Sequence, residues 1–223
     1  MELFRSLLFV PGNREDMLAK AATLPTDALV PDMEDSVPDK EKQHARQVIR
    51  ETVKALAGQG QTIIPRINAL NTGLAKEDLA AVVCAQVYGV TVGKVDSPWE
   101  IRQLCDLLDG LERQAGLPLG HTRLIPWLET SRAIVNAYQI ASASPRIVGV
   151  AFGAEDFTND MGVQRSEDGR EVAYPRAAVA VAARAAGVLA LDTPYVSFRD
   201  KEGLEREIRS VMPLGFNGKF AIH

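Results

Sequence analysis

The sequence predicts an α/β protein built as a (β/α)8 barrel, also called a TIM barrel, and two observations support this prediction. Short apolar runs rich in β-forming residues recur eight times along the chain, with helical patterns between them. Most of these runs are apolar throughout rather than alternating, which is typical of parallel strands covered on both faces. Eight strands in series with seven helices favour a closed barrel over its rival, an open doubly wound sheet.

The expected strands follow one another at similar spacing. In chain order they are Ser6–Val10, Ala28–Met33, Thr62–Ile67, Val90–Val95, Arg123–Leu128, Ile147–Phe152, Val188–Leu191 and Gly215–Ile222. The eighth run ends at His223, and no eighth helix or C-terminal extension follows it in the sequence. We therefore expect either a barrel that is unclosed on that side or a natural protein that continues further.

Helical patterns occupy the intervals between the strands. The clearest have apolar residues at helical spacing on one face, and they are Asp39–Ala57, Pro98–Gln114, Ser131–Ala141 and Pro175–Ala186. Pro98 is suited to a helix start, where its missing N–H is not needed. The longest stretch without a pattern, Gly153–Tyr174, is predicted to be a loop after the sixth strand, on the catalytic face of the barrel.

Composition narrows the class of protein. The 223 residues are 46% hydrophobic and 24% charged, with a net charge of −4, as in an ordinary globular protein. With no linker in view, we expect residues 1–223 to form one catalytic barrel domain. No basic run suggests nucleic acid, and no apolar segment is long enough to span a membrane. Cys84 and Cys105 form neither a metal motif nor a disulfide framework, so a cytoplasmic location is expected.

Polar residues gather where the predicted strands end, which is the edge at which barrel enzymes place their catalytic groups. Glu129 follows the fifth strand and Asp156 follows the sixth. Two carboxylates without histidine or thiol suit a hard cation such as Mg2+. Arg66, at the end of the third strand, supplies a planar cation for a carboxylate or enolate oxygen. Taken singly, each acid could instead be an ordinary helix-start charge.

Other motifs are weaker. No dinucleotide-binding, P-loop or nucleophile-elbow motif is present in the sequence. Gly12, after the first strand, could bring backbone close to a phosphate, although a plain turn is the stronger interpretation. His44 and His121 receive no role, and His223 is as compatible with a structural role as with a catalytic one.

An ordered set of segments resembles the citrate lyase beta-subunit-like family, of the HpcH/HpaI aldolase type, which includes malyl-CoA and citramalyl-CoA lyases. The set spans nearly the whole chain: Arg5–Gly12, Asp32–Val37 with Lys42 and Ala45–Arg46, Pro65–Asn68, Leu128–Thr130, Phe152–Phe157, Leu191–Tyr195 and Gly215–His223. Each segment alone is weak evidence for the resemblance, whereas the whole set in this order is specific for the family.

The resemblance implies a homo-oligomeric enzyme that binds Mg2+ through Glu129 and Asp156 and holds a keto-acid fragment and its oxyanion with Arg66. It also implies that Arg5, Lys42 and Asp32, together with Gly12 if it approaches a phosphate, lie near coenzyme A. Several family lyases carry a C-terminal extension that delivers a catalytic acid to a neighbouring subunit. This chain is similar to the short members without it, so the general acid/base stays open.

The resulting hypothesis is a Mg2+-assisted retro-Claisen cleavage of a 3-hydroxy-acid thioester of coenzyme A, with Glu34 or Asp35 as the base. The preferred substrate is (S)-citramalyl-CoA, giving acetyl-CoA and pyruvate. The alternatives are the citryl-lyase subunit of citrate lyase, a malyl-CoA lyase or thioesterase, and a non-catalytic binding relic. Because the eighth helix is missing, apolar surface should be exposed, and we expect a homo-oligomer, specifically a trimer.

Overall fold

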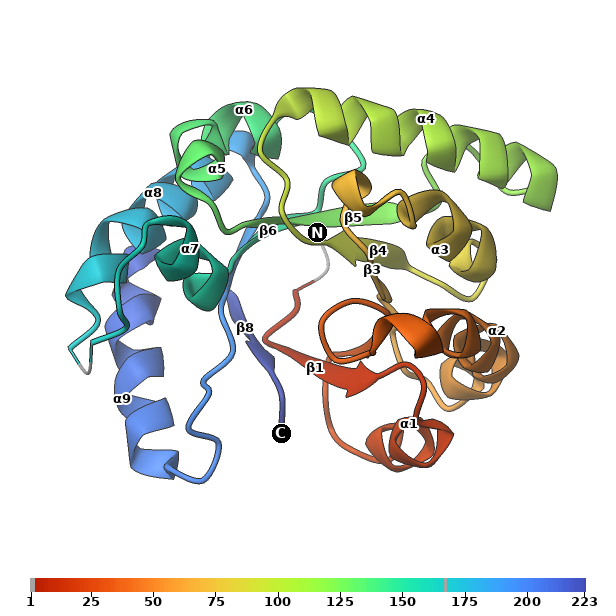
Figure 1. Ribbon diagram of the computed structural model, residues 1–223, viewed down its shortest axis with the longest axis horizontal. Helices are drawn as coiled ribbons and strands as arrows, with labels where there is room; N and C mark the ends of the chain where they lie inside the picture. The colour runs from red at the N-terminus through yellow and green to blue at the C-terminus, as the bar shows by residue number, and fades with distance from the viewer. Residues whose placement is uncertain (1–2, 167) are drawn as a thin grey trace.

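Eight parallel strands close into a barrel in the computed structural model of the protein, which describes residues 3–166 and 168–223. The strands follow one another around the barrel in chain order, and the last pairs with the first (Figure 1). They are β1 (Ser6–Pro11), β2 (Ala28–Asp32), β3 (Arg66–Ile67), β4 (Gly89–Val92), β5 (Arg123–Leu128), β6 (Gly149–Phe152), β7 (Leu189–Asp192) and β8 (Gly218–Ala221). The predicted (β/α)8 fold is confirmed.

Burial on both faces of the strands explains why they are apolar throughout. Every residue of β2, β4, β6 and β7 is buried. In β2, Ala28 and Val30 join the cluster that fills the barrel, whereas Leu29 packs outward with residues of the first two helices. Because both sides of the strand face protein, no alternating polar position is needed.

The helices surround the strands (Figure 1). They are α1 (Glu15–Ala21), α2 (Lys42–Gly58), α3 (Ala75–Val82), α4 (Pro98–Ala115), α5 (Ser131–Val135), α6 (Ala137–Ala141), α7 (Ala154–Asp160), α8 (Arg170–Ala186) and α9 (Lys201–Val211), with short 3-10 turns at Asp39–Glu41, Leu70–Thr72 and Met212–Leu214. As expected, Pro98 lies in the first turn of α4. Gly116 and Gly187 end α4 and α8 with φ of 68° and 73°, a conformation that favours glycine.

The predicted loop over Gly153–Tyr174 is wrong, because α7 and the start of α8 lie within it. The seven residues of α7 are too few for a helical period to show in the sequence. Helix α8 begins five residues before the predicted start at Pro175, which is tolerated inside the helix. The predicted helix Ser131–Ala141 is interrupted at Asn136, whose side-chain amide donates 2.9 Å to the carbonyl of Asp96.

The third strand is shorter than Thr62–Ile67, the predicted range. Regular pairing covers only Arg66–Ile67, and Ile63 forms an isolated bridge to Leu29. Pro65 lies between them and has no N–H to donate to a ladder. The strand nonetheless carries Arg66 to the rim of the barrel, in register with Asp32 of β2.

The sheet is closed between β8 and β1, so the strands do not form the unclosed barrel that was one of the two outcomes expected for this side. Within the described residues, no helix stands between α9 and α1, and the C-terminus lies there (Figure 1). A groove of about 710 Å3 occupies this side, with Leu8, Met17, Leu24 and Ile222 in its walls. No described helix is long and apolar enough to cross a membrane.

Candidate active site

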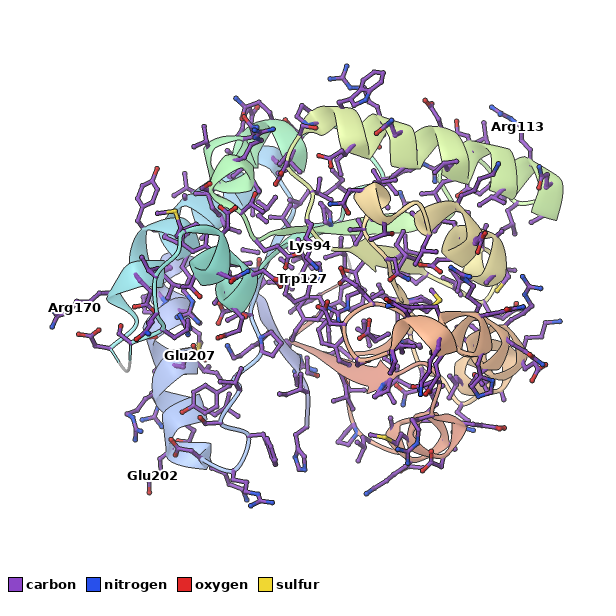
Figure 2. The ribbon with its side chains drawn as sticks, viewed as in Figure 1. Lys94, Arg113, Trp127, Arg170, Glu202 and Glu207 are labelled. Carbon is purple, nitrogen blue, oxygen red and sulfur yellow. The ribbon has the colours of Figure 1, made fainter. Side chains whose placement is uncertain are left out.

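A pocket of about 350 Å3 opens at the carboxyl ends of the strands. Its lining brings together residues that lie in or follow seven strands: Phe9, Asp32, Asp35, Ser36, Arg66, Trp127, Glu129, Gly153, Ala154, Glu155, Asp156, Thr193, Pro194 and Ile222. The floor is aromatic, because the Phe9 and Trp127 rings each pack on Phe220, with centroids 5.1 and 4.4 Å away. Trp127, labelled near the middle of Figure 2, donates its indole N–H to Thr91 at 2.7 Å.

Arg66 stands over this floor and is surrounded by acids. Its Nε and Nη2 each donate to one carboxylate oxygen of Asp32 at 2.6 Å. Its Nη1 lies 3.1 Å from Asp35 and 3.2 Å from Glu34, and its Cζ lies 4.5 Å from the centre of the Phe9 ring. Burial alone would raise the pKa of Asp32, but the hydrogen bonds from Arg66 outweigh it and hold that pKa below its usual range.

Glu129 is a deeply buried acid of the pocket, with 4% of its surface exposed. Space for it comes from glycines at the ends of the neighbouring strands: a Cβ at Gly93 would lie 2.8 Å from its Oε1, and one at Gly153 would lie 2.4 Å from its Oε2. Burial, followed by the charges of Asp156 and Glu34, raises the pKa of Glu129 to about 8. The site therefore holds more negative charge than its own cations neutralise.

The donor set around Glu129 fits a hard divalent cation. Asp156, in the first turn of α7, lies close enough for its charge to act on Glu129, and both carboxylates line the pocket. Among the described residues, no group of three or more His, Cys, Asp or Glu is placed to hold a metal ion. Glu129 and Asp156 would thus hold Mg2+ with two protein ligands, and water and substrate would supply the remaining oxygens.

Sequence reasoning missed Lys94, which joins two of these acids. Its backbone N–H donates to Glu129 Oε1 at 2.6 Å, and its Nζ donates to Glu34 Oε1 at 3.0 Å. Its φ of 56° is the only positive value of a non-glycine residue in the described chain. The available signal was a single charge inside the otherwise uncharged fourth run, Val90–Val95.

Three residues expected near coenzyme A lie outside this pocket. Arg5 precedes β1, at the opposite end of the barrel, and pairs with Asp27 at 3.0 Å. Lys42 is buried and donates to the backbone carbonyls of Met33 and Glu34 at 2.8 and 2.7 Å. Gly12 donates its N–H to the Asp32 carbonyl at 2.8 Å, and a Cβ there would lie 2.5 Å from that oxygen. Its surroundings are those of a tight turn against β2.

Two further polar strand ends do not line the pocket. Asp192, at the end of β7, is fully buried and pairs with Arg176 at 3.0 Å and Lys219 at 2.6 Å. His223 follows β8 and stacks on Phe198, with ring centroids 5.0 Å apart. The structure therefore groups Asp32, Glu34, Asp35, Arg66, Glu129 and Asp156, and leaves Arg5, Lys42, Asp192 and His223 outside the pocket lining.

Comparison with known proteins places these features in a family context. The sequence pattern of the HpcH/HpaI aldolase/citrate lyase family matches residues 5–223. The citrate lyase subunit beta of Leuconostoc mesenteroides subsp. cremoris is 37% identical over 221 residues, which cover 99% of this chain and 73% of that protein. The mitochondrial citramalyl-CoA lyase of Rattus norvegicus is 34% identical over 231 residues, covering 98% of this chain and 68% of that protein.

Solved structures show the same fold. The citrate lyase beta subunit of Mycobacterium tuberculosis, complexed with oxaloacetate and magnesium, has a TM-score of 0.78 and 30% identity, covering 99% of this chain and 92% of that one. The protein CitE of the same organism, in complex with magnesium, acetoacetate and coenzyme A, has a TM-score of 0.78 and 31% identity, covering 99% and 77%.

Proposed function

The chain belongs to the HpcH/HpaI aldolase/citrate lyase family, and we propose that it is a Mg2+-dependent lyase that cleaves a carbon–carbon bond in a 3-hydroxyacyl thioester of coenzyme A. Two similar proteins are lyases by name, and a similar structure holds magnesium and coenzyme A together. The free thiols of Cys84 and Cys105 support a cytoplasmic location for the enzyme.

The observation that carries this proposal is the pair of carboxylates, Glu129 and Asp156, in one pocket with Arg66. Mg2+ held by the two acids would polarise the hydroxyl and carboxylate oxygens of the substrate. Arg66 lies beside the same space and would stabilise the negative charge that develops on substrate oxygens. The bidentate pairing with Asp32 fixes the plane of its guanidinium before the substrate arrives.

Asp35 is the residue that we propose as the base. It lines the pocket and its side chain is 54% exposed, whereas Glu34 is buried and is absent from the lining; Arg66 and Lys94 flank both acids. Asp35 would accept the proton of the substrate hydroxyl. The hydroxyl carbon then becomes a carbonyl as the carbon–carbon bond breaks, and the thioester fragment leaves as an enolate that is protonated to acetyl-CoA.

Charge in the pocket favours (S)-citramalyl-CoA as the substrate, with acetyl-CoA and pyruvate as the products. Among the described lining residues Arg66 is the one cation, and it faces the acids Asp32, Asp35, Glu129, Glu155 and Asp156. A citryl thioester carries one more carboxylate, which would find no partner among them and would be costly to desolvate. A methyl group, in contrast, suits the apolar floor of Phe9 and Trp127.

Sequence similarity favours a second candidate, the citryl-lyase subunit of a citrate lyase, because the Leuconostoc protein is 37% identical. Malyl-CoA cleavage or hydrolysis uses the same groups on a substrate with hydrogen in place of the methyl. A non-catalytic binding protein is disfavoured, because a relic has no need of a pair of carboxylates in one pocket with an arginine.

A side-by-side assay of citramalyl-CoA, malyl-CoA and citryl-CoA tests the proposal. Citramalyl-CoA should give the highest kcat/KM, and EDTA should abolish turnover. Glu129→Ala and Asp156→Ala should each lose at least about 100-fold in kcat/KM and keep the fold, judged by circular dichroism. Glu51→Ala, an exposed acid on α2, serves as the control and should match wild type. Full activity in EDTA, or a preference for citryl-CoA, would contradict the metal or the substrate assignment respectively.

A further inference from the structure

Lys94 adopts a backbone conformation that lysine ordinarily avoids. With φ at 56° it is left-handed, and every other positive φ in the described chain belongs to glycine. Such a conformation costs conformational energy for a residue with a Cβ and persists where the surroundings enforce it. Lys94 follows β4 directly after Gly93, at the rim where the acids gather. Figure 2 shows Lys94 towards the middle of the molecule, near the label of Trp127.

The conformation lets Lys94 contact carboxylates that follow two different strands, and its Nζ also lies 3.6 Å from Asp35. The backbone N–H of Lys94 fixes Glu129 Oε1 at 2.6 Å, while its Nζ fixes Glu34 Oε1 at 3.0 Å. The other oxygen of Glu34 lies 3.2 Å from Arg66 Nη1. Each oxygen of Glu34 therefore has a cation beside it, although Glu34 itself is buried, with 5% of its surface exposed.

Glu34 and Glu129 face the same small space. A Cβ built on Gly93 would lie 2.8 Å from Glu129 Oε1 and 3.1 Å from both oxygens of Glu34. Glu34 and Glu129 are thus neighbours across the space beside Gly93, and Asp156 lines the same pocket as Glu129. Of these, Glu129 and Asp156 line the pocket, whereas Glu34 is turned to Lys94 and Arg66.

We propose that Lys94 is a positioning residue that withholds Glu34 from the Mg2+ that Glu129 and Asp156 would hold. The inference rests on the proposed function for the identity of that metal. Mg2+ takes six oxygen ligands in nearly ideal octahedral geometry. With two protein carboxylates, positions stay open for the carboxylate and hydroxyl of the substrate. A third carboxylate would bind the ion more tightly and close one of those positions.

Titration calorimetry with MgCl2, which needs no turnover, tests the proposal through a double-mutant cycle. Lys94→Met should tighten Mg2+ binding at least about tenfold, because it frees Glu34 Oε1 to reach the ion. In a Glu34→Gln background the same change should alter the Kd by less than about threefold. Lys94→Arg retains a cation for Glu34 and should bind Mg2+ as wild type does. Lys54→Met removes an exposed lysine of α2 and serves as the control for net charge.

The outcomes separate the possible failures. If Lys94→Met tightens Mg2+ equally with and without Glu34, the lysine acts only through its charge and the inference is wrong. No tightening in either background also overturns it. The titration of the wild-type protein alone tests whether it binds Mg2+. If it binds none, the metal of the proposed function is wrong, and this inference is wrong with it.

A second variant guards against loss of fold. Lys94→Gly keeps the backbone N–H to Glu129, removes the ammonium and relieves the left-handed conformation. It should melt at or above the wild-type Tm and still show the tightened Mg2+ binding of Lys94→Met. A lower Tm with unchanged Mg2+ affinity would mark Lys94 as a structural residue and overturn the proposal.

Discussion

At the scale of single residues, Glu129 has the largest expected effect on how the stability of the protein depends on pH. Burial, with the charges of Asp156 and Glu34, raises its pKa to about 8 from an ordinary value of 4.5. Between these two values the metal-free folded protein binds a proton that the unfolded chain releases. The stability that protonated Glu129 contributes is present below pH 4.5 and is lost as the pH rises through about 8.

We therefore expect the Tm of the protein in EDTA to fall by at least about 3 °C between pH 6 and pH 9. Glu129→Gln cannot ionise and should flatten this fall, whereas Glu51→Gln, at an exposed site on α2, should retain it. Saturating MgCl2 at pH 9 should restore the Tm, because it neutralises the ionised pair. Differential scanning calorimetry gives these values, and a fall that persists in Glu129→Gln would show that another group titrates.

Residue types at strand ends predicted most of this site, since Arg66, Glu129 and Asp156 are brought to one pocket. The sequence does not reveal the role of Lys94, because the fourth run predicts a strand that continues through Val95 and because a left-handed lysine has no sequence signature. Arg5 and Lys42 were placed near coenzyme A by resemblance alone. A sequence motif does not show which group a cation will contact. In the structure Arg5 pairs with Asp27, and Lys42 donates to two backbone carbonyls.

At the scale of elements, the glycines that follow β4 and β6 make the acidic pocket possible. Gly153 has φ of −107° and ψ of 98°, which any residue can adopt, so its requirement is steric. A Cβ there would lie 2.4 Å from Glu129 Oε2 and 2.7 Å from Glu129 Cβ. Since the second contact involves the stem of a buried side chain, Glu129 would have to move.

Gly153→Ala should destabilise the fold by about 1–3 kcal/mol and weaken Mg2+ binding at least about tenfold. Gly110→Ala, inside α4, is the matched control, because a Cβ there meets nothing within 4 Å. That variant should be more stable by about 0.5–1 kcal/mol and bind Mg2+ normally. Urea melts and calorimetry measure both effects. Unchanged Mg2+ binding in Gly153→Ala would mean that Glu129 is not the ligand.

The order of elements was largely predictable, because a parallel strand buried on both faces needs no polar residue and so stands out as an apolar run. An apolar run does not show, however, whether the strand forms backbone hydrogen bonds with its neighbours along its whole length. Pro65 interrupts the third strand, and only Arg66–Ile67 keeps regular pairing. Helix α7 has seven residues, fewer than two full turns, so its helical period does not show in the sequence.

At the scale of the whole molecule, the apolar groove between α1 and β8 predicts that the protein associates with itself. Met17 and Leu24 are each 41% exposed and Ile222 is 47% exposed along the groove between α1 and β8. Contiguous apolar surface of this kind seldom stays bare in a protein dissolved in water. We propose that a neighbouring copy covers it in a homo-oligomer, with a trimer as the expected state.

Light scattering at micromolar concentration should give about three times the mass of one chain, 24.2 kDa. Met17→Glu places a charge in the groove and should lower the measured mass, because a buried unpaired charge opposes association. Leu119→Glu, at a residue 55% exposed outside the groove, should leave the mass unchanged. A monomeric wild type would contradict the prediction of an oligomer, and a dimer would contradict the trimer alone.

The aromatic floor of Phe9, Trp127 and Phe220 closes the pocket on the side of the barrel interior, so the pocket opens towards solvent. Side chains fill the barrel beneath it, so nothing can leave through the far end. Under the proposed reaction, the oxo acid forms against the floor and the thioester fragment lies between it and solvent. Under the same proposal, the products would depart in a fixed order, acetyl-CoA first and pyruvate last. The last product to leave can also bind the empty site, so pyruvate would compete with the substrate whenever it accumulates.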